Sequence, residues 1–114
     1  MTDPAEIAGW HAHIYYDPAT RPAAEALRAA IAAAFPAALL GRWHDEPVGP
    51  HTQAMYQVAF PAALLPAFLP WLMLNRRGLP VLVHPETGHE RADHTLHAGW
   101  LGAMLPLRTE VLSA

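Results

Sequence analysis

The sequence predicts an α+β domain whose elements follow the order β-α-β-β-α-β. Three observations indicate it: segments in which aromatic or branched side chains alternate with polar ones, two alanine- and leucine-rich segments suited to helices, and proline- or glycine-rich breaks between them. The 114 residues fit one domain, residues 1–114, with a core from about residue 10 to 107. Right-handed crossovers then give a ferredoxin-like sandwich, in which a four-stranded antiparallel sheet carries both helices on one face.

The first strand is expected over residues 10–16, where side chains alternate in character. Its two faces carry Trp10, Ala12, Ile14 and Tyr16 on one side and His11, His13 and Tyr15 on the other. The following turn should start a helix, with Thr20 as N-cap and Pro22 in the first turn, where a missing N–H costs little. One apolar stripe of this helix should cover the sheet, and Pro36 weakens the helix near its end.

The middle of the chain predicts two further strands and a second helix. A strand from Leu39 to His44 is followed by a loop over residues 45–50, because two prolines and a glycine cannot continue a ladder. The third strand runs from about Thr52 to Phe60, and a helix from about Ala62 to Leu74 ends at an Asn-Arg-Arg-Gly sequence typical of a C-terminus. In the third strand, the side chains expected on the histidine face are Gln53, Met55 and Gln57.

The last strand is expected from Val81 to His84, ending at Pro85, and a loop over residues 86–93 follows. The segment from Thr95 to Leu105 is compatible with either helix or extended chain. The sheet face without helices would carry His11, His13, Tyr15, Gln53 and Gln57. A polar, aromatic face of this kind suits a ligand, a second subunit or both, so we expect a homodimer formed through the sheet or its edges.

The composition is dominated by imidazole, with eight histidines, no cysteine, no lysine and a formal net charge of −3. The missing lysines remove the basic surface that nucleic acids need, and the missing cysteines exclude disulfides and thiolate chemistry. The sequence shows no secretory signal, and its longest apolar stretch, residues 60–74, is too short to span a membrane. A soluble, cytoplasmic protein without membrane partners is expected. Because imidazole binds transition metals and titrates near neutral pH, the composition indicates a metal or acid/base enzyme.

Five short motifs, taken together, resemble one known family. They read HAHIYY, PVGPH, WLMLNR, VLVHPETG and DHT, the last followed by WLG, and they extend over most of residues 10–107. In this combination the chain is similar to the DOPA 4,5-dioxygenase family. The resemblance implies a ferredoxin-like fold, self-association, and extradiol cleavage of a catechol such as L-DOPA by O₂ at a non-haem Fe(II) centre.

The resemblance also implies roles for particular residues. The metal is expected on a subset of three histidines, joined by a carboxylate or a fourth histidine: His13, His51 and His84. Acid/base work on the substrate is assigned to His11, His94 and Tyr15. Substrate binding is assigned to Arg42, Gln53 and Arg76, with Asp93 orienting a neighbouring imidazole. Glu86 and Glu90 are expected to be solvated, and the remaining histidines to lie on the surface or in packing contacts.

Antiparallel pairing places His51 near the Tyr15 end of the first strand and His84 near the His11 end. For one metal to reach all of them, the sheet must curl strongly; otherwise there are two centres, or a second subunit contributes. Ordinary hydrogen-bonded histidines remain the alternative for each position. Two other functions stay open: a non-catalytic metal- or ligand-binding module, and a metal-free acid/base enzyme of the dimeric α/β barrel type.

Overall fold

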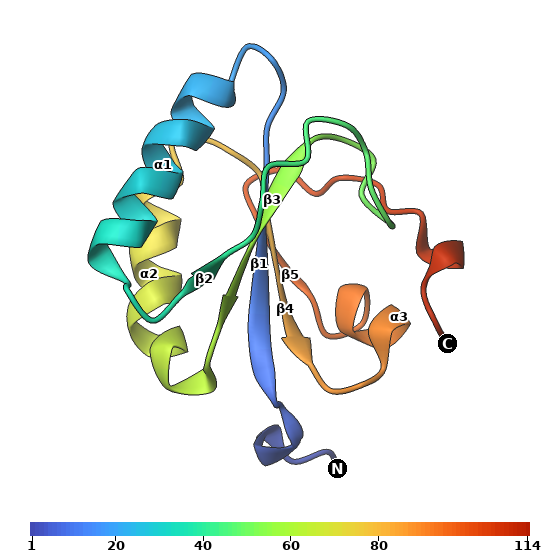
Figure 1. Cartoon of the computed structure of the whole chain (residues 1–114). Coiled ribbons are helices and arrows are strands. Elements are labelled where there is room, and N and C mark those ends of the chain that lie inside the picture. The colour runs from blue at the N-terminus through green and yellow to red at the C-terminus, as the bar shows by residue number, and fades with distance from the viewer.

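Strand β1 (Gly9–Tyr15) lies at the centre of a five-stranded antiparallel sheet in the computed structural model, which describes residues 1–114 (Figure 1). The strand order is β2-β3-β1-β4-β5. The other strands are β2 (Leu39–Leu40), β3 (Met55–Phe60), β4 (Val81–Glu86) and β5 (Gly99–Leu101). The helices are α1 (Arg21–Ala34), α2 (Leu65–Asn75) and α3 (Glu90–His94), with short 3₁₀ turns at Pro4–Glu6, Ala62–Leu64 and Thr109–Val111.

The first four strands and two helices confirm the predicted βαββαβ order and the split βαβ arrangement. The expectation of four strands is wrong, because the unassigned segment after residue 95 adds β5 to the free edge of β4. The added pairing is short, from Val81 opposite Leu101 to Val83 opposite Gly99. No helix is long and apolar enough to cross a membrane.

Helices α1 and α2 pack together on one face of the sheet, where they bury the main core (Figure 1). Alternate residues of β1 and β3 point into this core, including Ile14 and Val58, while Leu27 and Leu72 reach it from the two helices. The Tyr56 hydroxyl donates to the carbonyl of Ala24 at 3.1 Å, which satisfies a polar atom that the core would otherwise leave unpaired. The predicted faces of the first and third strands are therefore confirmed.

Helix α1 begins after Thr20, as predicted, but the cap works differently from the expectation. The Thr20 side chain makes no capping hydrogen bond; its backbone N–H and hydroxyl both donate to Asp17 Oδ1, at 2.8 and 3.0 Å. Asp17 thus closes the turn before the helix, and Pro22 occupies the first turn.

Three strands differ in length from the prediction, and one of them, β3, begins at Met55 rather than at Thr52. Strand β2 ends at Leu40, although the Gly41 N–H still donates to the Gln57 carbonyl at 2.7 Å, a close approach at which a Cβ would lie 3.1 Å from that carbonyl. Bridge pairing with β3 resumes at His44 and Met55. Strand β4 continues through Pro85, which was expected to end it. The partner β5 pairs only with residues 81–83, so the β5 side of Pro85 is an unpaired edge, where proline is tolerated.

The opposite sheet face is not bare, contrary to the expectation. Helix α3 and the C-terminal segment cover it, on the side away from α1 and α2 (Figure 1). A second, smaller core forms there from Tyr15, Met55 and Leu82, packed against Ala98, Trp100, Leu105 and Leu107. The Arg91 side chain links α3 to the C-terminal segment, because its guanidinium donates to the carbonyls of Thr109 and Leu112. The predicted homodimer stays a prediction.

Two leucines of α2 provide a matched test of this layer arrangement. Leu72 is fully buried against the sheet, whereas Leu74 is 86% exposed. Leu72→Ala should lower the free energy of unfolding by about 2–5 kcal/mol, because it opens a cavity, while Leu74→Ala should change it by less than about 0.5 kcal/mol. Chemical denaturation measures both. An equal loss of unfolding free energy in the two variants would mean that α2 does not pack against the sheet through the side that carries Leu72.

Candidate functional site

Five imidazoles gather on the sheet face opposite α1 and α2. Two come from β1, one from β4, one from the loop before β3 and one from α3: His11, His13, His84, His51 and His94. The His13 ring lies at the centre, with centroid separations of 4.3 Å to His51 and 5.1 Å to His84. The His94 ring lies 4.0 Å from that of His84. The predicted convergence is therefore confirmed within one chain.

The strand register explains this convergence. His11 pairs with His84 across β1 and β4, and the side chain of His13 leaves the same face of β1 two residues further on. His51 lies at the other end of β1, where its Nδ1 is 2.7 Å from the Tyr15 hydroxyl. These placements agree with the two ends expected from antiparallel pairing. Because His13 lies between these two ends of the strand, its ring contacts both His51 and His84.

Four of these imidazoles line a cavity of about 270 Å³, and the fifth, His84, is fully buried beside them. Its walls are almost entirely polar, with Leu112 the one apolar side chain apart from Pro50 and Gly88. The full lining is His11, His13, Pro50, His51, Gln57, Glu86, Gly88, Glu90, Asp93, His94 and Leu112. This composition suits a metal or a polar reaction centre better than a purely hydrophobic ligand.

Burial keeps the central imidazoles uncharged. Desolvation lowers the pKa of His51 and of His84 to about 4, and neighbouring imidazoles add to the effect. The same desolvation, with four surrounding histidines, holds the pKa of His13 well below its usual value. For His11, burial lowers the pKa although Glu86 opposes it. Neutral imidazole is the form that binds metal ions.

Three of the rings have a tautomer fixed by an acceptor. The Nδ1 atoms of His84 and His94 lie 3.0 and 2.7 Å from the carbonyl oxygens of Pro85 and Glu90, and that of His11 lies 3.0 Å from Glu86 Oε1. Carbonyls and carboxylates only accept, so each Nδ1 carries the proton and Nε2 keeps a lone pair. This outer hydrogen bond is typical of metal-binding histidines.

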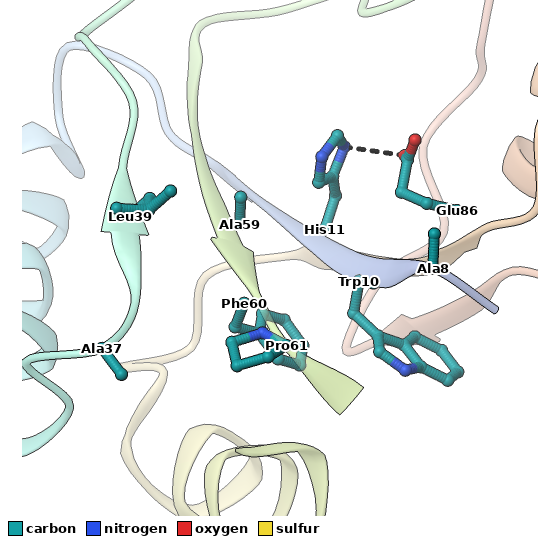
Figure 2. Close-up of a pocket in the computed structure, with 10 residues that line it drawn as sticks. Ala8, Trp10, His11, Ala37, Leu39, Ala59, Phe60, Pro61 and Glu86 are labelled. Atoms are coloured by element: carbon teal, nitrogen blue, oxygen red, sulfur yellow. Dashed lines mark ion pairs between the residues drawn. The ribbon is translucent and has the colours of Figure 1, made fainter. Parts of the chain in front are cut away.

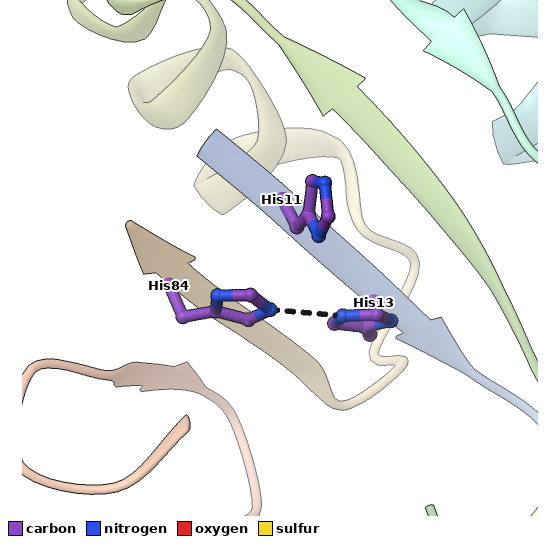
Figure 3. Close-up of side chains that lie close together, drawn as sticks. All are labelled: His11, His13 and His84. Atoms are coloured by element: carbon purple, nitrogen blue, oxygen red, sulfur yellow. Dashed lines mark hydrogen bonds between the residues drawn. The ribbon is translucent and has the colours of Figure 1, made fainter. Parts of the chain in front are cut away.

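Among the five imidazoles, His13 is the one with an unsatisfied buried nitrogen. Its Nε2 lies 3.1 Å from His84 Nε2, and its Nδ1 is buried without any hydrogen-bond partner (Figure 3). Two imidazole nitrogens at about 2.1 Å from one ion and at right angles to each other are about 3 Å apart. The contact between His13 and His84 therefore fits two neighbouring ligands of one metal.

Two overlapping sets of three histidines could hold an ion, and both contain His13. One is His11, His13 and His84, and the other is His13, His51 and His94; in each set the ligand atoms lie within 4.8 Å of one another. Neither set includes a carboxylate. The donor set thus fits a divalent transition metal, with imidazole in every protein ligand position.

The predicted ligands are divided between these sets. His13 and His84 fall in one, and His13 and His51 in the other, while His11 and His94, expected to act on the substrate, are members as well. Tyr15 does not line the cavity. It is fully buried beneath Trp100, at a ring separation of 5.7 Å, and desolvation raises its pKa, so its hydroxyl serves as a hydrogen-bond partner of His51.

The three predicted substrate-binding residues lie away from the cavity. Arg42 is exposed, Gln53 donates to the carbonyl of Tyr16, and Arg76 donates to the carbonyl of Leu79 at the end of α2. Asp93 lines the cavity, but its carboxylate accepts from the backbone N–H and hydroxyl of Thr87 rather than from an imidazole. Although burial alone would raise it, these hydrogen bonds lower the pKa of Asp93.

Glu86 is the site residue that the sequence analysis missed. It was assigned to a solvated loop, yet it ends β4 and its Oε1 lies 3.0 Å from His11 Nδ1 and 3.7 Å from His84 Nδ1. The signal was available in the spacing, since a strand that continues through Pro85 puts Glu86 on the face of His84, two residues earlier.

Fold and site together define a class: ferredoxin-like α+β proteins with a buried, histidine-rich centre suited to a metal. The family follows from comparison with known proteins. A model of the Dopa 4,5-dioxygenase family matches residues 10–111, and the chain belongs to this family.

Individual relatives agree. A solved structure of a proposed dioxygenase from Nostoc punctiforme is 50% identical, with a TM-score of 0.95 over 97% of this chain and 96% of the other. The DOPA 4,5-dioxygenase of Amanita muscaria is 36% identical over 111 residues, covering 90% of this chain and 49% of that protein. An uncharacterised 21.2 kDa protein of Botryotinia fuckeliana is 43% identical over 81 residues, covering 64% and 44%. The chain spans about half the length of these two curated relatives.

The buried imidazoles predict an acid-sensitive fold. Unfolded histidines take up protons below about pH 6.5, whereas His51 and His84 resist protonation until about pH 4. The unfolded chain therefore binds more protons in this window, so the free energy of unfolding of metal-free protein should fall as pH falls, by on the order of 1–2 kcal/mol per buried histidine at pH 5.

Denaturation of chelator-treated protein between pH 7.5 and about 5 measures this slope. His84→Gln should make the slope shallower, and His89→Gln, at an exposed position, serves as the matched control. A slope that is the same in all three proteins would contradict burial of the neutral ring.

Proposed function

We propose that this protein is a non-haem Fe(II) extradiol dioxygenase that opens the ring of a catechol. The observation that carries the proposal is the buried cluster of uncharged imidazoles around His13, in a chain that belongs to the Dopa 4,5-dioxygenase family. When bound, Fe(II) supplies open positions at which a catechol and O₂ meet. The protein's share is to hold the ion, to orient the ring and to move protons.

We assign His11, His13 and His84 as the ligands. Three features favour this set over the alternative: the 3.1 Å approach of His13 Nε2 and His84 Nε2, the register pairing of His11 with His84, and Glu86 as the acceptor for His11 Nδ1. Both strands belong to the rigid centre of the sheet, which favours a preorganised ligand geometry.

This assignment leaves His51 and His94 for proton transfer. Both rings face the cavity, and both have Nδ1 engaged, by the Tyr15 hydroxyl and by the Glu90 carbonyl. Each therefore presents Nε2 to a substrate. The low pKa of His51 keeps its ring neutral near pH 7, so its Nε2 can accept a proton from a catechol hydroxyl in the tautomer whose Nδ1–H donates to the Tyr15 hydroxyl.

The overall reaction balances without an external reductant. The catechol supplies all four electrons that reduce O₂, and both oxygen atoms enter the product. The carbon–carbon bond beside the diol breaks, so that one hydroxylated carbon becomes a carboxylate and its unsubstituted neighbour becomes an aldehyde. The other hydroxylated carbon becomes an enol or ketone, and the residues of the cavity handle the released protons.

The reaction is tested by loading the protein with Fe(II) without oxygen and then adding air with L-DOPA, caffeate or another catechol. A yellow semialdehyde should form, with one O₂ consumed per ring and both atoms of labelled O₂ found in the product. Colourless mixtures and no oxygen uptake, despite bound iron, would favour a non-catalytic binding module. Turnover that survives chelation would instead favour a metal-free acid/base enzyme.

The ligand assignment predicts a split among histidine variants. His84→Ala should weaken Fe(II) binding by more than the about 10–100-fold expected for an outer hydrogen-bond partner, while His51→Ala should retain the ion and lose turnover. Metal analysis after dialysis and anaerobic titration measure the first, and oxygen uptake the second. His89→Ala, at an exposed position, is the matched control. If His51→Ala released the ion and His84→Ala retained it, the alternative set of His13, His51 and His94 would hold the metal.

A further inference from the structure

A second hollow, of about 470 Å³, adjoins the histidine cavity at the end of the sheet (Figure 2). His11 and Glu86 line both spaces, so the two adjoin at these residues. Apart from them, the lining is apolar: Ala8, Gly9, Trp10, Ala37, Leu39, Ala59, Phe60 and Pro61. We call this space the apolar groove.

The floor of the apolar groove follows one row of the sheet. Leu39 on β2 pairs with Ala59 on β3, Ala59 pairs with His11 on β1, and His11 pairs with His84 on β4. In Figure 2, Leu39, Ala59 and His11 project from the same side of the sheet, with Trp10 and Phe60 on the other. A molecule held at His11 would therefore extend over Ala59, whose small side chain leaves space, towards Leu39.

No cation lines the route. The chain has no lysine, and none of its arginines lines the histidine cavity or the apolar groove. The charged side chains present are all carboxylates: Glu86, Glu90 and Asp93. Arg42 and Arg76, the residues expected to clamp a substrate carboxylate, lie elsewhere. An anionic ring substituent would thus lose its water without gaining an ionic partner, at a substantial energetic cost.

We propose that the apolar groove receives the ring substituent of the substrate, and that the substrate is a catechol whose substituent is uncharged and apolar. The proposal rests on the proposed ring cleavage and narrows it to one substrate class. Leu39 supports it, since this side chain is 71% exposed at the sheet edge and would be covered by such a substituent. Catechols whose substituent carries a carboxylate and no ammonium group rank below neutral ones.

The test compares two ligands that differ in one charge: 3-(3,4-dihydroxyphenyl)propanoate and its methyl ester. Dissociation constants are measured by calorimetry on the metal-free protein, and kcat/KM is measured on the Fe(II)-loaded protein. The ester should bind about tenfold more tightly than the acid and have the higher kcat/KM.

Two variants at one surface position sharpen the comparison. Leu39→Arg places a cation at the end of the apolar groove and should reduce the ester-to-acid preference by about tenfold. Leu39→Gln introduces a side chain of similar length without a charge. The ester-to-acid preference of this variant should stay within about twofold of that of the parent protein. Circular dichroism establishes that both variants fold before the ligands are compared.

The outcomes separate this proposal from the proposed function. An acid that binds as tightly as the ester overturns the assignment of the apolar groove, and so does an arginine variant that leaves the ester-to-acid preference unchanged. Ring cleavage with a preference for the acid would refute the proposed role of the apolar groove and support the proposed ring cleavage. A preference for the ester in binding, with no catechol cleaved, would support the role of the apolar groove and refute the proposed ring cleavage.

Discussion

The site depends on keeping several imidazoles uncharged inside a folded chain. Burying a protonated imidazole without a counter-ion is costly, and the three central rings have exposures of 4% or less. Their low pKa values express this cost, and the carbonyl acceptors at Nδ1 of His84 and His94 remove part of the remaining polar penalty. What remains is a group of neutral rings around His13, a donor set that could hold a metal ion.

The two faces of β1 have different roles: one contributes to the core and the other to the site. Residues such as Ile14 face the helices and supply apolar burial, while His11, His13 and Tyr15 face the other side, two residues apart. A shift of register by one residue would exchange the faces and place imidazoles in the main core. The strong burial of the helix face therefore fixes the position of the histidines, and stability of the core is a condition for the site.

The sequence predicts the parts of the site that local periodicity controls. The alternation around His13 identifies the face of β1, and antiparallel pairing places His51 at the Tyr15 end of that strand. Contacts that periodicity does not encode are missed. The three-residue strand β5 and the cover from Arg91 and the C-terminal segment arise from long-range pairing. Arg76 is instead held by the nearby Leu79 carbonyl, and Arg42 is exposed. Glu86 was missed for a local reason, because proline was taken to end β4 at a position where the edge is unpaired.

The two sets of three histidines share His13 and differ in how rigidly the backbone holds their other two members. His11 and His84 stand opposite each other in the central ladder of β1 and β4. His51 and His94 come from a loop and a five-residue helix, and the C-terminal segment holds both carriers, through the His51–Leu107 bridge and through Arg91. Ligand geometry tolerates little displacement, whereas proton transfer requires a ring to approach a substrate that arrives and leaves. The ladder is therefore the better place for an ion, and the two rings on the softer supports are the better placed to move protons.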